Sequence, residues 1–266
     1  AYSKMAFEMA YLKVHYPLAF YAALLSIEPN PEKEIEHFQS AKRMQVEIKN
    51  PSINRSGADF TVENNALRIG LGFIKGTRSD FVEAILDERQ ARGPYENMND
   101  FINRLDERWQ KEKVILALMY VGAFDQLGYN RAEMVQALPG LIEGASKFQT
   151  LSLSDDLAPV IEHRSEFNLN ERLAKESEYL GLYISGHPVN QYAQLQARLH
   201  SQVISQVQVE QVVTLIVQIN RVRVVKTKRD RRDMAFLTVS DETGNLDVTV
   251  FPNQYQQFKD ELSNNR

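Results

Sequence analysis

The sequence contains no cysteine. A disulfide framework, a zinc ribbon and a thiol nucleophile are therefore excluded, because each of them requires thiol groups. The five histidines are scattered, and no two of them have the H-x-x-x-H or HExxH spacing of a metal site, so we expect neither a metal ion nor another cofactor in this chain. A chain without cysteine also fits a cytoplasmic protein, which is the compartment that we expect.

Long apolar runs are absent as well. No stretch approaches the ~20 apolar residues that cross a bilayer, and the N-terminal residues lack the basic segment and apolar core of a signal peptide. We therefore expect no membrane association.

A starting methionine is also missing, which indicates a piece of a longer chain. Its 266 residues suffice for two or three domains.

Helical periodicity runs through most of the chain. Apolar residues recur every three or four positions over 3–27, where Pro17 must break or kink the helix, and again over 31–45. Between 67 and 138 short helices alternate with turns that contain glycine. Residues 139–170 are mixed and polar, and we predict that they form a linker.

The apolar period changes to two from residue 212 onward, in "VVTLIVQINRVRVV", "MAFLTVS" and "LDVTVF". This pattern predicts three strands, with a hairpin turn at 241–245 between the last two. The apolar phase slips by one residue after Ile219, which predicts a β-bulge near Asn220 and Arg221. With that bulge, the arginines of the first strand lie on the face opposite the core, while Ala235, Leu237 and Val239 point into it.

A basic run joins the first two predicted strands. It holds seven basic residues and one acid in a chain whose formal net charge is −4. A long bulged strand followed by such a loop resembles an OB-fold, in which this loop clasps single-stranded nucleic acid. We expect Phe236, on the outer face, to stack on a base; contact with a neighbouring domain is the alternative for Phe236, and a solvated turn is the alternative for the run. The expected basic contacts are Arg221, Arg223, Lys226, Lys228, Arg229, Arg231 and Arg232.

A second candidate site is the turn that follows Leu71. The pattern Leu71-x-x-Ile74-x-Gly76-Thr77-Arg78 resembles a helix-hairpin-helix motif. In that motif, glycine lets the backbone approach a phosphate, and the next helix presents free amides to it. Arg78 replaces the second glycine of the motif. Its positive charge would then contact the phosphate, in place of the close approach of a glycine backbone. We expect the residues Lys75, Gly76, Thr77 and Arg78 to bind duplex DNA, and a turn that only packs is the alternative.

The segment from Leu118 to Phe124 resembles a more degenerate copy of this motif, with its glycine at Gly122. Its turn contains no basic residue. We therefore interpret it as a structural partner that completes a paired unit.

A third candidate lies in the predicted linker. Leu151-Ser152-Leu153 resembles the core of the Q-L-[SD]-L-F peptide that bacterial proteins insert into the sliding clamp. Gln149 is displaced by one position, and Ser154 stands where the aromatic anchor belongs, so a weak contact is expected because buried anchors dominate such binding. The alternative is a plain linker.

Six sequence blocks, in order along the chain, together resemble the alpha subunit of bacterial DNA polymerase III, of the replicative DnaE type. They are "MAYLKVHYPLAFYAALLS", "PSINRSGADFTV", "LRIGLGFIKG", "VGAFDQLG", "YLGLYISGHPVNQY" and "MAFLTVSDETGNLDVTVF". Paired hairpins that precede the OB-fold favour this branch over the sister replicative polymerase, whose OB-fold lies near its N-terminus.

The resemblance implies a multidomain, mainly α chain that ends in a small, truncated all-β OB-fold. Residues 1–48 would end the fingers region, and 49–170 would be the tandem helix-hairpin-helix, DNA- and clamp-binding domain with its linker. Residues 171–211 would be a connecting helical segment, and 212–266 an incomplete OB-fold.

The same resemblance implies a part of a DNA-directed DNA polymerase. The family transfers nucleotides with two metal ions held by palm aspartates. These aspartates, and the Mg²⁺ expected there, would lie before Ala1, so we expect no catalytic residue in this chain. The hairpins would grip the product duplex and the OB-fold would contact the single-stranded template. Expected partners are both forms of DNA, the sliding clamp and other replicase subunits.

Other classes of protein also contain these modules. The anticodon-binding OB-fold of an aminoacyl-tRNA synthetase resembles residues 212–251, but nothing in 1–211 fits such an enzyme. A DNA ligase combines both modules, yet its K-x-D-G nucleophile motif is absent. A scaffold whose basic loop contacts only solvent or protein is the third alternative.

Overall fold

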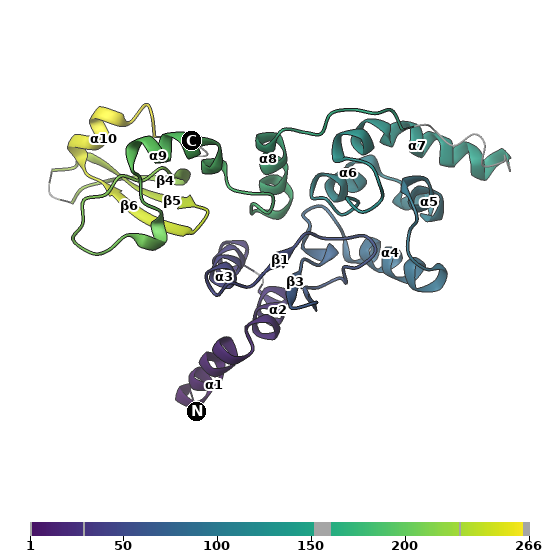
Figure 1. Ribbon diagram of the computed structural model, residues 1–266, viewed down its shortest axis with the longest axis horizontal. Coiled ribbons are helices and arrows are strands. Elements are labelled where there is room, and N and C mark those ends of the chain that lie inside the picture. Colours follow the sequence, from purple (N-terminus) through teal and green to yellow (C-terminus); the bar gives the residue numbers. More distant parts are fainter. Residues whose placement is uncertain (1, 29, 152–160, 229, 263–266) are drawn as a thin grey trace. The chain divides into compact units, whose positions relative to one another are not determined.

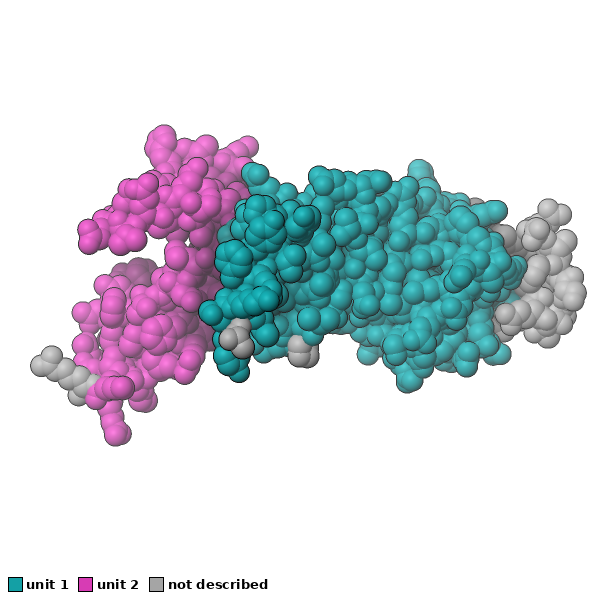
Figure 2. All heavy atoms as spheres, turned by 90° about the horizontal axis from the view of Figure 1, so that it is seen from below, with its two compact units in different colours: residues 1–185 teal, residues 186–266 magenta. Residues whose placement is uncertain are grey.

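The computed structural model describes residues 2–28, 30–151, 161–228 and 230–262, which form two compact units (Figures 1 and 2). Unit 1, Ala1–Ser185, is rich in helices, and unit 2, Gly186–Arg266, contains a three-stranded antiparallel sheet. This arrangement confirms the predicted fold class. None of the described helices is long and apolar enough to cross a membrane.

Unit 1 begins with three helices, α1 (Tyr2–His15), α2 (Pro17–Ile27) and α3 (Pro31–Arg43). The predicted break at Pro17 is confirmed: α1 ends at His15, and Pro17 opens α2, where its missing amide costs no hydrogen bond. The side chains of Tyr21 and Leu25 on α2 are buried in the core of the unit.

A small mixed sheet follows, with strands β1 (Ile48–Lys49), β2 (Thr61–Glu63) and β3 (Ala66–Arg68). Its order is β1-β3-β2; β1 is parallel and β2 antiparallel to β3. The sequence did not predict this sheet, because strands of two or three residues are too short to show a period of two.

The rest of unit 1 consists of helices and turns (Figure 1). Their buried side chains form one hydrophobic core. The prediction of a linker from residue 139 was wrong, because helix α7 runs through Pro139 to Leu151. Pro139 lies on an exposed side, where water can satisfy the carbonyl that loses its partner, while the neighbours Leu138 and Leu141 are buried and hold the helix. The elements are η1 (Leu71–Phe73), α4 (Ser79–Arg92), α5 (Met98–Arg104), η2 (Glu107–Trp109), α6 (Glu112–Tyr120), α7 (Arg131–Leu151) and α8 (Leu169–Leu180).

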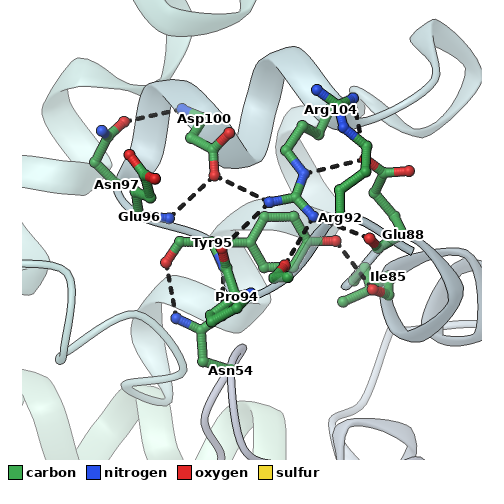
Figure 3. Close-up of polar contacts among 11 residues, drawn as sticks. Asn54, Ile85, Glu88, Arg92, Pro94, Tyr95, Glu96, Asn97, Asp100 and Arg104 are labelled. Atoms are coloured by element: carbon green, nitrogen blue, oxygen red, sulfur yellow. Dashed lines mark hydrogen bonds and ion pairs between the residues drawn. The ribbon is translucent and has the colours of Figure 1, made fainter. Parts of the chain in front are cut away.

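A polar cluster joins α4 to α5 (Figure 3). The Arg104 guanidinium donates to the Glu88 carboxylate at 3.0 Å and to backbone carbonyls, among them that of Gly93 at 2.9 Å. It also lies 4.3 Å from the ring centroid of Tyr95, whose hydroxyl donates to the carbonyl of Ile85 at 2.9 Å. Burial raises the pKa of Tyr95 to about 12. The cluster fixes the C-terminal half of α4, the helix that follows the first hairpin.

Unit 2 is built on the antiparallel sheet β4-β5-β6. The predicted core residues of β5 are buried: Ala235, Leu237 and Val239. The expected hairpin turn connects β5 to β6. The first strand begins at Gln218, and not at residue 212 as predicted: over 212–217 the only described pairing is an isolated bridge at Leu215. The elements are η4 (Pro188–Tyr192), α9 (Ala193–Leu199), η5 (Ile204–Gln206), β4 (Gln218–Lys226), β5 (Asp233–Asp241), β6 (Gly244–Val250) and α10 (Pro252–Phe258).

The predicted β-bulge is confirmed. Ile219 pairs with Val239, but the next pair joins Arg221 to Thr238, so Asn220 is an extra residue in β4. Arg221 is exposed, while Val222 packs against the core of unit 2. The bulge therefore absorbs the slip in the apolar pattern.

Candidate nucleic-acid interface

The first hairpin is an exposed turn between η1 and α4. Gly76 has φ +94°, a backbone conformation that favours glycine, and a Cβ added there would meet nothing within 4 Å. The Thr77 hydroxyl donates to the carbonyls of Ile74 at 2.6 Å and of Leu71 at 3.0 Å, which closes the turn. The space at the Cβ position of Gly76 is therefore open.

The two cations of this hairpin differ in their surroundings. The Lys75 side chain is exposed, and its backbone amide donates to the carbonyl of Tyr179 at the end of α8 (2.8 Å). Arg78 is the N-cap of α4 and forms a bidentate pair with Asp80, with distances of 3.1 and 2.8 Å. This guanidinium lowers the pKa of the Asp80 carboxyl. The four predicted residues 75–78 thus lie together at one surface, where Arg78 is paired with Asp80 and Lys75 lies within electrostatic reach of Glu34.

The second hairpin is enclosed. Gly122 has φ +82°, and a Cβ there would lie 2.3 Å from Arg131 Nη2 and 2.5 Å from Asp125 Oδ2. Arg131 is buried and is held by Asp125 at 2.9 Å and by Glu176 at 3.3 Å. The carbonyl of Ala123 accepts the amide of Ile53 at 2.8 Å, which ties this turn to the chain before the first hairpin.

The outer face of the unit 2 sheet presents two cross-strand rows of side chains. Arg223 pairs with Phe236, which pairs with Thr249; in the next row Arg221 pairs with Thr238, which pairs with Asp247. Both arginines are exposed, and Phe236 is 44% exposed. An aromatic ring thus has a cation beside it on one strand, an arrangement suited to a stacked base and its phosphate.

The β4–β5 loop carries less free charge than its sequence suggests. Lys226 pairs with Asp233 at 2.9 Å, and Arg232 pairs with Asp230 and donates to Asn253 at 3.0 Å. Lys228 and Arg231 are exposed, and Arg231 has φ +52°. Arg229 lies outside the described residues. Two of the predicted contacts therefore have acidic partners, Lys226 at the strand ends and Arg232 in the loop.

The predicted clamp peptide falls at the end of α7. Gln149 and Leu151 belong to the last turns of this helix, whereas Ser152 and Leu153 lie outside the described residues. Its use stays a prediction.

Sequence reasoning missed two buried polar groups. Glu176 accepts the amides of Ile184 and Ser185 at 2.8 and 2.9 Å, in addition to its contact with Arg131. In unit 2, His187 Nε2 and Ser240 Oγ are 3.0 Å apart, and Ser240 Oγ lies 3.2 Å from Oδ1 of Asn220 in the bulge. Their partners lie up to 53 residues away in the chain, so no local pattern marks them.

Comparisons with known proteins match one family model to unit 1 and another to unit 2. Residues 45–134 match the model of the helix-hairpin-helix motif, and residues 213–266 match that of an OB-fold nucleic acid binding domain. The chain is 34% identical over 267 residues to DNA polymerase III subunit alpha of Staphylococcus epidermidis (strain ATCC 12228 / FDA PCI 1200), which covers 99% of the chain and 25% of that relative. It is 33% identical over 269 residues to the same subunit of Staphylococcus aureus (strain Mu50 / ATCC 700699), which covers 100% of the chain and 25% of the relative.

The chain thus spans about a quarter of the length of the curated relatives that it matches. The similarity extends over residues 1–211 as well as over the OB-fold. The chain is homologous along its length to DNA polymerase III alpha subunits, and it fits their C-terminal portion.

Proposed function

We propose that this chain is a non-catalytic, DNA-binding part of a bacterial replicative DNA polymerase and contributes to its processivity. The observation that carries the proposal is the pair of exposed cationic surfaces, at Gly76 and at Phe236, in a chain homologous to alpha subunits. The four segments 1–48, 49–170, 171–211 and 212–266 would be the end of the fingers, the hairpin domain, a connection and the OB-fold.

The first hairpin would hold the product duplex. The open space above Gly76 and the exposed Lys75 and Arg78 side chains support a contact with a phosphate. Phosphate contacts carry no sequence information, as suits an enzyme that copies any template. The test is duplex binding across a salt titration by the variant K75A/R78A. The matched control is K111A/K113A, which removes the same charge from an exposed part of the same unit.

In this test the hairpin variant should bind more weakly, and the slope of log affinity against log salt should fall by about 0.9 for each lost phosphate contact. The control should keep the wild-type slope. Equal binding by both variants would argue for the scaffold alternative.

The outer face of β4 and β5 would hold the single-stranded template. Stacking on Phe236 is indifferent to base identity, and Arg221 and Arg223 would follow the backbone. Alanine at Arg221 and Arg223 should weaken binding to single strands and reduce its salt dependence. So should alanine at the loop residues Lys226, Lys228, Arg229, Arg231 and Arg232. The control R198A/K259A removes two exposed cations elsewhere in unit 2.

Contact with the sliding clamp is the third element of the proposal, and it rests on the Leu151-Ser152-Leu153 sequence at the end of α7. Deletion of residues 149–154 should remove stimulation of the polymerase by the clamp. Full stimulation of the deletion variant would place the contact elsewhere.

The proposal assigns nucleotidyl transfer and its Mg²⁺ to parts of the enzyme outside this chain. Within the described ranges, no three His, Asp or Glu side chains form a group that could hold a metal ion. In this proposal the chain binds DNA and contacts other subunits of the enzyme.

A further inference from the structure

Glu166 lies against the N-terminus of α7, the helix that follows the second hairpin. Its two carboxylate oxygens accept the backbone amides of Arg131 at 3.1 Å and of Ala132 at 3.3 Å. The amide of Phe167 donates to the same carboxylate at 2.7 Å. A carboxylate with both oxygens on the first amides of a helix takes the position that a phosphate oxygen pair takes in a helix N-terminal anion site.

The other amides of this helix end are also satisfied within the chain. The amide of Asn130 donates to Glu133 Oε2 and that of Glu133 to Asn130 Oδ1, both at 2.9 Å. Together with the two amides held by Glu166, these account for the four amides that a helix N-terminus leaves without a helical partner. No amide of this turn remains for an external phosphate.

The segment that carries Glu166 is anchored at the same place. The Asn130 side-chain amide donates to the carbonyl of Arg164 at 2.6 Å, and the amide of Arg164 donates to Glu133 Oε1 at 3.1 Å. These amide hydrogen bonds lower the pKa of the Glu133 carboxyl, so it stays ionised at neutral pH. Glu166 is therefore held in position by two further contacts.

The first hairpin is less completely closed. Its N-cap residue Arg78 makes no side-chain hydrogen bond to the first turn of α4, where the Asp80 carboxylate accepts the amide of Phe81 at 3.0 Å. A Cβ added at Gly76 would meet nothing within 4 Å. At the second hairpin the Arg131 and Asp125 side chains fill the space around Gly122. Two turns of the same motif thus differ in whether a phosphate can reach them.

We propose that Glu166 is an internal phosphate mimic that closes the second hairpin to DNA, so that the chain grips the duplex through the first hairpin alone. This inference rests on the proposed function, because it concerns the same duplex contact. The closure has two components: the carboxylate occupies the amides, and its negative charge repels an approaching phosphate.

The first test measures duplex binding by the full chain across a salt titration. E166A and E166Q are compared with E162A and E162Q, which make the same changes at an exposed acid four residues earlier. E166A should bind duplex several-fold more tightly than E162A, and its salt slope should steepen by about 0.9, the value for one added phosphate. E166Q removes the charge but keeps an acceptor, so its slope should lie between the two.

The second test does not depend on DNA. Inorganic phosphate should raise the thermal midpoint of E166A more than that of E162A, because a ligand that binds only the folded state stabilises it. Without phosphate E166A should melt lower, because the amides of Arg131 and Ala132 lose their acceptor. Equal phosphate responses and equal salt slopes for the Glu166 and Glu162 variants would overturn the inference. If no variant binds duplex, the proposed function fails, while the phosphate titration still decides whether Glu166 closes an anion site.

Discussion

Arg78 and Asp80 form a bidentate ion pair at the mouth of the first hairpin. An acid two residues from the proposed phosphate contact weakens that contact in two ways, by sharing the guanidinium and by repelling the phosphate. Asp80→Asn is therefore expected to raise duplex affinity several-fold and to increase the loss caused by Arg78→Ala, since Arg78 is then fully available.

A double-mutant cycle on duplex binding measures both effects. Glu83→Gln, at an exposed acid one turn further along α4, provides the control for charge. Identical affinities for the D80N and E83Q variants would show that the ion pair does not restrain Arg78.

The two hairpin glycines have similar φ values but different surroundings. Substitution by alanine is therefore expected to lower the free energy of unfolding by different amounts at the two positions. Gly76→Ala meets open space and should lose about 1–2 kcal/mol through backbone strain. Gly122→Ala must also displace the buried Arg131 guanidinium, so a loss of about 3–5 kcal/mol is expected. Urea unfolding followed by the fluorescence of Trp109, the single tryptophan, reports the difference. Comparable losses in the two variants would contradict the enclosed geometry.

Tyr95 predicts a loss of stability at high pH. Its pKa is about 12 in the folded chain because of burial, against about 10 when unfolded. A raised folded pKa stabilises the fold fully below pH ~10, and the contribution disappears as the pH rises from about 10 to about 12; its size is roughly 3 kcal/mol. Urea midpoints of Tyr95→Phe should therefore fall less steeply over this range than those of the wild type, whereas Tyr129→Phe, at an exposed tyrosine, should follow the wild type. Parallel curves for Y95F and the wild type would refute the prediction.

Arg223 and Phe236 should contribute differently to single-strand binding. Loss of a stacked base costs about 1–3 kcal/mol and leaves the number of phosphate contacts unchanged. Phe236→Ala is thus expected to lower affinity at every salt concentration by the same factor, whereas Arg223→Ala should reduce the salt slope by about 0.7. The measurement is a fluorescence anisotropy titration with oligothymidine at several salt concentrations. A change of slope in F236A would show that the ring supports the backbone contact and not the base.

Local rules predicted the features of this chain that have local causes. The missing amide of proline predicts the break at Pro17, and the slip in apolar phase predicts the bulge near Asn220 and Arg221. The helix through Pro139 was missed because buried leucines on either side outweigh the lost hydrogen bond.

For the candidate site, the sequence identified the hairpin and the basic strand. It did not show which of their charged side chains are paired with other groups. The pairing of Arg78 with Asp80 depends on rotamers, and the contact of Glu166 with α7 joins residues 34 or 35 positions apart. Such contacts follow from tertiary structure, so charge counting along the sequence overstates how much of the basic run is free.

Because β4 contains an extra residue, the effect of a single-residue deletion depends on its position in this strand. Removing Asn220 would bring the Ile219–Val239 and Arg221–Thr238 pairs into a regular ladder, with every later side chain on its present face. Removing Val222 would instead place Arg223 opposite Leu237, in the core, and would move Val224 from the face of Ala235 to the outer face beside Phe236. One single-residue deletion would therefore preserve the arginine face, while another, two positions away, would exchange it with the hydrophobic one.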